Sequence, residues 1–107
     1  MNCQTQAILQ KLDGKNIKFE KITLFCEDNE LMLHADILCE NEIFSLLFSH
    51  VTSLSLKAGT HHFEMEGFSF CDKKKDGYEA DVRYYIEDYQ QDTLSFYCRD
   101  VEALTIT

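Results

Sequence analysis

The segment His61-His-Phe-Glu-Met-Glu66 holds the densest group of side chains that can do chemistry. In an extended chain every second side chain points to the same face, so His62, Glu64 and Glu66 would line one face about 7 Å apart. One imidazole and two carboxylates can bind a divalent metal if a facing strand adds a fourth ligand. Alternating polar residues on a solvated strand give the same pattern. A metal site at His62, Glu64 and Glu66 is therefore the minor alternative.

Motifs for catalysis are not found in the sequence, which has no nucleophile elbow, no H-E-x-x-H and no glycine-rich phosphate loop. A thiol and a base, such as Cys39 with His34 or His50, act together only if the fold brings them into contact. A buried structural role is the favoured interpretation of Cys39. We therefore expect a protein that is not an enzyme and that holds no cofactor.

The charge of the chain argues against nucleic acid and anionic membranes as partners. Ten Lys and Arg against nineteen Asp and Glu give a formal net charge of −9. The one basic run, Lys73–Lys75, lies between Asp72 and Asp76, and a phosphate-binding surface needs clustered cations. A basic protein would instead be attracted by the field of this chain.

The cysteines and the first residues favour a cytoplasmic protein. The chain begins with uncharged polar residues, and no apolar run reaches the length of a membrane span. The five cysteines are odd in number and show no C-x-x-C spacing, which favours reduced thiols. They are Cys3, Cys26, Cys39, Cys71 and Cys98.

The apolar pattern predicts an all-β fold in a single domain, residues 1–107. In the segment 78–86 every second residue is apolar or aromatic, which is typical of a strand with one buried face. Similar runs predict about eight strands within 17–106, in an antiparallel β-sandwich or partly open β-barrel. Changes of phase at Glu20-Lys21 and at Gly67 predict a bulge or bend. A helix is expected over 3–12, ending at Asp13-Gly14.

Several bulky side chains have the phase that points away from the predicted core. Relative to the side chains that we assign to the core, five bulky residues face outward: Phe25, Met32, Leu38, Tyr85 and Tyr97. Residues of these types are common in interface cores, and an apolar patch on a sheet is typical of a binding site. The alternative is that the helix or a second sheet covers them.

Two hypotheses for the function remain. The segments Glu66–Asp72, Tyr85–Tyr89 and Leu94–Cys98 are similar to β-rich bacterial toxin-immunity proteins. The likeness covers under half of the chain, and it implies a protein partner without assigning any functional residue. We expect a small acidic protein-binding module, bound to a basic protein or to itself as a homodimer. The alternative is a domain that binds a small molecule or a metal in the barrel mouth or the sandwich interior.

Overall fold

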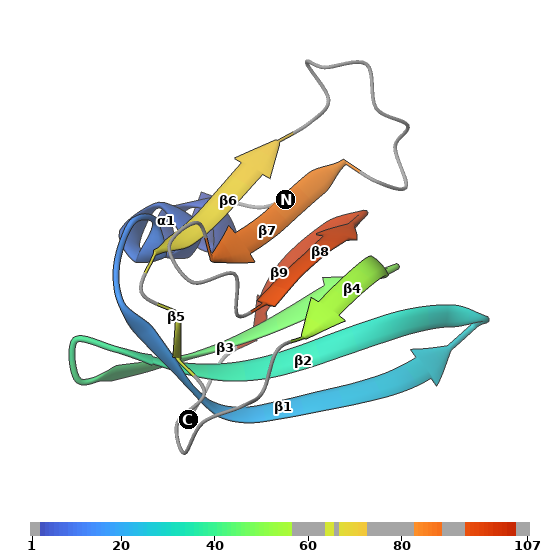
Figure 1. Ribbon diagram of the computed structural model, residues 1–107, viewed down its shortest axis with the longest axis horizontal. Coiled ribbons are helices and arrows are strands. Elements are labelled where there is room, and N and C mark those ends of the chain that lie inside the picture. The colour runs from blue at the N-terminus through green and yellow to red at the C-terminus, as the bar shows by residue number, and fades with distance from the viewer. Residues whose placement is uncertain (1–2, 57–63, 66, 73–82, 89–93, 105–107) are drawn as a thin grey trace.

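The computed structural model describes residues 3–56, 64–65, 67–72, 83–88 and 94–104, which form one helix and nine strands (Figure 1). Helix α1, Cys3–Leu12, has the predicted bounds. Its apolar residues recur at helical spacing, and Leu9 and Leu12 are buried. The helix is followed by Gly14, whose φ of 77° is a left-handed conformation that glycine adopts without steric cost.

Three long strands follow the helix as an antiparallel meander. They are β1 (Ile17–Glu27), β2 (Glu30–Cys39) and β3 (Glu42–Ser49). Two-residue turns, Asp28-Asn29 and Glu40-Asn41, join them, and all four turn residues have positive φ. Such turns match the right-handed twist of the strands, and Asn and Asp tolerate these backbone angles better than most residues. The tight turn keeps β1 and β2 paired out to Glu27 and Glu30.

The remaining strands are shorter. They are β4 (Thr52–Leu56), β5 (Glu64–Met65), β6 (Phe68–Asp72), β7 (Tyr84–Asp88), β8 (Leu94–Cys98) and β9 (Asp100–Leu104). Hydrogen bonds join the nine strands of the described residues into two sheets, in the orders β5-β1-β2-β3-β9 and β4-β8-β7-β6. Every strand pair is antiparallel.

The chain passes from one sheet to the other at two neighbouring corners. His50 and Val51 separate β3 from β4, and Arg99 separates β8 from β9. The backbone N–H of Arg99 donates to the carbonyl of Ser49 at 2.9 Å, which holds the two corners together. Gly67 lies between β5 of one sheet and β6 of the other. The bend that the sequence predicts at this glycine is therefore present.

The core fills the space between the two sheets. The rings of Phe48 on β3 and Phe96 on β8 meet edge to face with centroids 5.0 Å apart. Both side chains are almost completely buried, so this pair joins the sheets at the centre of the molecule. The other large, fully buried side chains are Leu9, Leu12, Ile17, Leu33, Ile37, Leu46, Phe68, Ile86 and Leu94.

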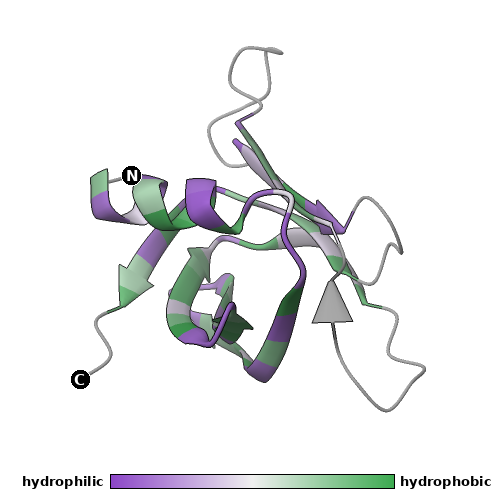
Figure 2. Cartoon of the chain, turned by 90° about the vertical axis from the view of Figure 1, so that its left-hand side faces the viewer, coloured by the Kyte–Doolittle hydropathy of each residue, from purple (hydrophilic) through white to green (hydrophobic). Residues whose placement is uncertain are grey.

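Helix α1 covers the core beside β9 and β6. Figure 2 shows it lying across one end of the molecule, next to the end of β9. The Oγ1 of the buried Thr5 accepts a hydrogen bond from the backbone N–H of Ala103 in β9 at 3.0 Å. The backbone N–H of Gly14 donates to the carbonyl of Phe68 at 2.7 Å, so the chain after the helix is attached to β6.

The predicted fold class is confirmed, with two differences in detail. The bulge expected at Glu20-Lys21 is present, since the β1–β2 register shifts between Phe19 and Lys21. A second register shift, between Thr52 and Ser55 in β4, was not predicted; it includes Ser53, which has positive φ. The structure has nine described strands where the sequence predicts about eight, because Gly67 divides one expected strand into β5 and β6.

Across the described residues, no helix is both long enough and apolar enough to span a membrane.

Candidate functional site

The five residues predicted as a binding surface lie on two different sheets. Phe25, Met32 and Leu38 belong to β1 and β2 of the five-stranded sheet, whereas Tyr85 and Tyr97 belong to β7 and β8 of the four-stranded sheet. In β7, in β8 and in β2 from Leu33 onward the burial alternates, and Leu38, Tyr85 and Tyr97 occupy the less buried positions, whereas Met32 is buried. The structure therefore separates them into two surfaces on opposite sides of the sandwich.

The end of β1 is exposed on both faces of the strand. Leu24 and Phe25 are 45% and 37% exposed, and Cys26 and Glu27 are also exposed. Leu24 has the phase of the core face, but here the β1–β2 hairpin extends past the strands of the other sheet (Figure 1). Met32 lies opposite Phe25 in β2 and is only 8% exposed, so it supports the ring and adds little surface. We call residues 22–32 the hairpin end.

One edge of the hairpin end has no partner strand in the part of the chain that the structure describes. Among the described residues, β5 pairs with β1 at Ile17 and Lys18, before the bulge. The segment Ile22-Thr-Leu-Phe-Cys26 contains no charge, no proline and no glycine, and its residue types favour strands. Natural edge strands are normally blocked by a charge, a proline or a bulge. This stretch has none of the three.

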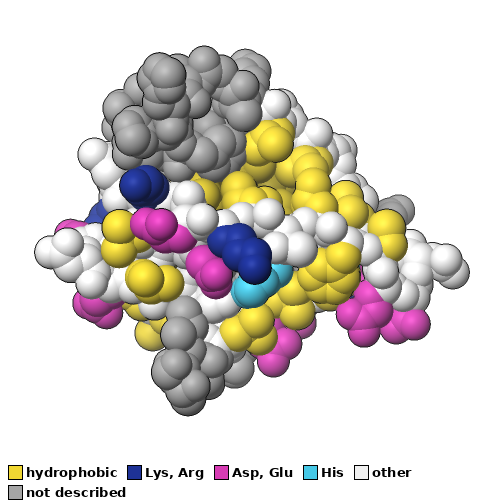
Figure 3. All heavy atoms as spheres, turned by 90° about the horizontal axis from the view of Figure 1, so that it is seen from below, with side chains coloured by type: hydrophobic (Ala, Val, Ile, Leu, Met, Phe, Trp, Pro, Cys, Tyr) yellow, Lys and Arg dark blue, Asp and Glu magenta, His cyan; other side chains and the backbone are white. Residues whose placement is uncertain are grey.

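Figure 3 shows an apolar area on the face of the molecule seen from below. Hydrophobic side chains gather on the right half of the face seen from below, toward the end where the β1–β2 turn lies in Figure 1, with acidic side chains at their lower right margin. Besides Leu24 and Phe25, Leu56 of the edge strand β4 is 48% exposed. Contiguous apolar surface of this kind is typical of an interaction site, whereas single exposed hydrophobes are not.

A charged cluster anchors the hairpin end to the corner between the sheets. Both guanidinium NH2 groups of Arg99 donate to the carboxylate of Glu30, at 2.6 and 2.7 Å. These hydrogen bonds hold the pKa of Glu30 below its ordinary value. His50 Nδ1 lies 3.5 Å from the same carboxylate, and His50 has a φ of 54° at the corner. These contacts connect Glu30, at the start of β2, to His50 and Arg99 at the corner between the sheets.

The two tyrosines form the outer surface of the four-stranded sheet. Tyr85 and Tyr97 lie directly opposite each other on β7 and β8, with ring centroids 4.6 Å apart. Cys71 and Thr52 continue the row on the flanking strands. All four are partly buried, so this tyrosine face presents less apolar surface than the hairpin end.

A serine, a histidine and an aspartate meet on the outer face of the five-stranded sheet. His34 Nε2 lies 2.6 Å from Ser45 Oγ and 3.5 Å from Asp36 Oδ1. In an acyl-transfer triad the carboxylate binds the ring nitrogen that does not face the serine. Both contacts here involve the same nitrogen, so the cluster lacks the geometry of a triad. It is a cross-strand polar contact, which the sequence does not predict because Ser45 and His34 are on different strands.

The cysteine chemistry considered from the sequence does not assemble. Among the described residues, His34 has polar contacts with Ser45 and Asp36, and His50 has one with Glu30. Burial raises the pKa of Cys39, and burial raises the pKa of Cys98 far above the range in which a thiolate forms. Both thiols therefore behave as buried apolar groups, whereas Cys3 and Cys26 are exposed.

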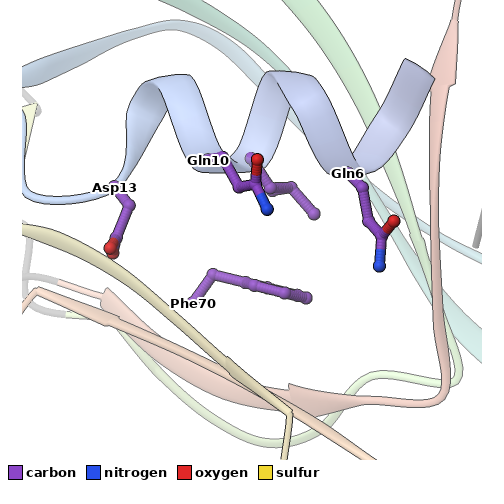
Figure 4. Close-up of a pocket in the computed structure, with 5 residues that line it drawn as sticks. Gln6, Gln10, Asp13 and Phe70 are labelled. Carbon is purple, nitrogen blue, oxygen red and sulfur yellow. The ribbon is translucent and has the colours of Figure 1, made fainter. Parts of the chain in front are cut away.

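A shallow depression of about 160 Å³ lies between α1 and β6 (Figure 4). Gln6 and Gln10 of the helix and Asp13 just after it form one side, and the ring of Phe70 forms the other; Leu9 also lines the depression. Sites for small molecules usually enclose about 300–1,000 Å³. The depression is smaller than that range.

The predicted metal ligands fall largely outside the described residues. His62 and Glu66 are not described, and Glu64 belongs to β5. Within the ranges that the structure does describe, no group of three or more His, Cys, Asp or Glu side chains is placed to bind a metal ion.

Comparison with known proteins adds no assignment, since no family model, curated protein or solved structure matches this chain.

Proposed function

We propose that this chain is a non-enzymatic protein-binding module and that the hairpin end, residues 22–32, is its binding surface. One observation carries the proposal: the last residues of β1 expose Leu24 on one face and Phe25 on the other while the strand remains regular and paired with β2. Complete burial of such a side chain contributes roughly 1.5–3 kcal/mol, and because each is a little under half exposed, less than half of that is forgone in water. A partner that covers them recovers part of this free energy.

The mode of binding that fits this surface is the addition of a strand. An extended segment that pairs with a free sheet edge gains backbone hydrogen bonds along its length, and side chains on alternate faces give specificity. The uncharged stretch 22–26 has a backbone edge of this kind and apolar side chains on both faces. The proposal therefore needs no pocket and no catalytic group.

The acidic residues around the hairpin end favour a partner strand that carries a cation. Glu27 and Glu30 lie directly opposite each other beside the turn, and Asp28 is in the turn. Arg99 binds Glu30, but among the described residues Glu27 has no ion pair. Like charges opposite each other destabilise a hairpin, and a cation beside Glu27 relieves the repulsion. A toxin-immunity role, which the resemblance implies, is one form that such binding takes.

The alternative function, a small-molecule or metal site in the interior, has less support. Phe48 and Phe96 meet at the centre of the sandwich and fill the space that a ligand would occupy. The depression beside Phe70 is small for a ligand. We therefore favour protein binding over this alternative.

Site-specific photo-crosslinking in the source cells tests the proposal. A benzophenone amino acid in place of Phe25 keeps an aromatic side chain at the hairpin end. The same probe in place of Ile43 is the matched control, because Ile43 is an exposed hydrophobe (55%) on β3. We expect a discrete crosslinked product from position 25 and only background from position 43. Equal labelling from both positions, or no discrete product from position 25, contradicts the proposal, and a product from a probe at Tyr97 alone would move the site to the tyrosine face.

A further inference from the structure

We propose that the strand which covers the hairpin end is β1 of a second copy of this chain, antiparallel to the first, with the two-fold axis at Leu24. This inference rests on the proposed function of the hairpin end and names its occupant. In a symmetric dimer the same surface is used twice, so it must be complementary to itself. Three properties of residues 21–27 meet this condition.

The first property is the direction of the backbone groups. Glu27 and Glu30 flank a two-residue turn and therefore form the hydrogen-bonded pair that closes the hairpin. Pairs alternate along an antiparallel ladder, so Thr23 and Phe25 also bond toward β2. The backbone N–H and C=O groups of Ile22, Leu24 and Cys26 then point away from β2, to the edge that has no partner strand among the described residues. With the two-fold axis at Leu24, Leu24 of one copy forms a hydrogen-bonded pair with Leu24 of the other copy. On each side of this pair, Ile22 of one copy pairs with Cys26 of the other.

The second property is the match of side chains in this register. A two-fold axis at Leu24 pairs each residue with the one equally far on the other side of position 24. On the face of Leu24, all the paired side chains are apolar: Ile22 with Cys26 and Leu24 with itself. On the other face Thr23 pairs with Phe25. Both exposed side chains, Leu24 and Phe25, thereby gain a neighbour across the interface.

The third property is charge. The same register places Lys21 of each copy opposite Glu27 of the other, so the dimer contains two pairs of opposite charge. Neither Lys21 nor Glu27 has an ion pair among the described residues, and Glu27 lies next to the like charge of Glu30. Glu20 and Asp28 oppose each other with like charge in this register, but Asp28 is in the turn, beyond the strand. The strand edge therefore attracts its own copy locally, although each molecule carries a net charge of −9.

The free edge is short, so the dimer is expected to be weak. Interfaces below about 1,200 Å² are typical of transient complexes. Sedimentation should be measured from about 5 to 500 µM, at about 0.15 M salt, where charge interactions are screened beyond roughly 8 Å. We expect the mean mass to rise with concentration from 12.5 kDa toward twice that value. A constant mass of one chain over this range overturns the inference.

Charge reversal tests the register. Lys21→Glu changes the net charge from −9 to −11, and Glu27→Lys changes it from −9 to −7. If the proposed pairs exist, both single variants weaken the dimer, by about tenfold in the dissociation constant, and the double variant Lys21→Glu/Glu27→Lys restores it. If only net charge mattered, the two single variants would change it in opposite directions. That outcome, or a double variant without restored affinity, overturns the register.

A disulfide provides a second test. In the proposed dimer the Cα atoms of residue 24 in the two copies lie about 5.5 Å apart, within the usual range for a disulfide. With Cys3 and Cys26 changed to serine, Leu24→Cys should form a covalent dimer on mild oxidation, and Ile43→Cys should not. Equal dimer yields from both variants contradict the inference. If the chain stays monomeric but the probe at position 25 crosslinks another protein, the proposed function holds and only the second copy is excluded.

Discussion

At the scale of single residues, the ring pair Phe48–Phe96 joins the two sheets within the core. The two side chains come from different sheets, and both are almost completely buried. Exposed hydrophobes such as Ile43 contribute little to folding because water still surrounds them. The residues that hold the sheets together are therefore distinct from those that we assign to binding.

Truncation of the ring on β8 tests this distinction. Phe96→Ala removes the ring and leaves a cavity between the sheets, and we expect the free energy of unfolding to fall by about 3–5 kcal/mol. Ile43→Ala, the control, should change it by less than about 0.5 kcal/mol. Urea unfolding followed by tyrosine fluorescence measures both. A similar small loss for the two variants would mean that Phe96 is not at the centre of the core.

At the scale of elements, the two hydrogen bonds from Arg99 to Glu30 connect the β1–β2 hairpin to the corner where β8 passes into β9. We call this pair of hydrogen bonds the clamp. Arg99 holds the pKa of Glu30 below its ordinary value of 4.5. Because the pKa is lowered on folding, the clamp stabilises the fold fully above that value, and the contribution is lost as the pH falls through the lower, folded-state value.

Replacing the arginine should therefore have a pH-dependent effect. We expect Arg99→Gln to lower the Tm most at neutral pH, with the difference from the unmodified chain shrinking as the pH falls below 4.5. Glu30→Gln provides the control, because it removes the carboxylate that titrates: in that background the effect of Arg99→Gln should not vary with pH in this way. Thermal unfolding between about pH 3 and pH 7 measures both. An Arg99→Gln difference that is equal at the two ends of the range would contradict the clamp.

At the scale of the whole molecule, the sequence predicts those features of the fold that depend on residues close together in the chain. The helix over 3–12, the bulge after Phe19 and the bend at Gly67 follow from local spacing, and all are present. The sequence does not predict which sheet each strand joins. That assignment depends on the corners at His50 and Arg99, which pair residues far apart in the chain.

The same limit applies to the candidate site. The outward phase of Phe25 and Tyr85 can be read from alternation, but their separation onto two sheets cannot. The exposure of Leu24 cannot be predicted from alternation either. Its side chain points to the face of β1 that covers the core, and it is exposed because the hairpin extends past the other sheet. The more exposed of the two large hydrophobic side chains on the binding surface, Leu24, is therefore one that periodicity assigns to the interior.

Amide hydrogen exchange, resolved by residue with NMR, tests most directly that the far half of β1 is a free edge. In dilute protein we predict slow exchange at Thr23 and Phe25, whose N–H groups point to β2, and fast exchange at Ile22 and Leu24, whose N–H groups point outward. Raising the concentration to about 1 mM should slow the second pair. Equal protection of Leu24 and Phe25 in dilute protein would contradict the account, because the edge would then be covered within a single molecule.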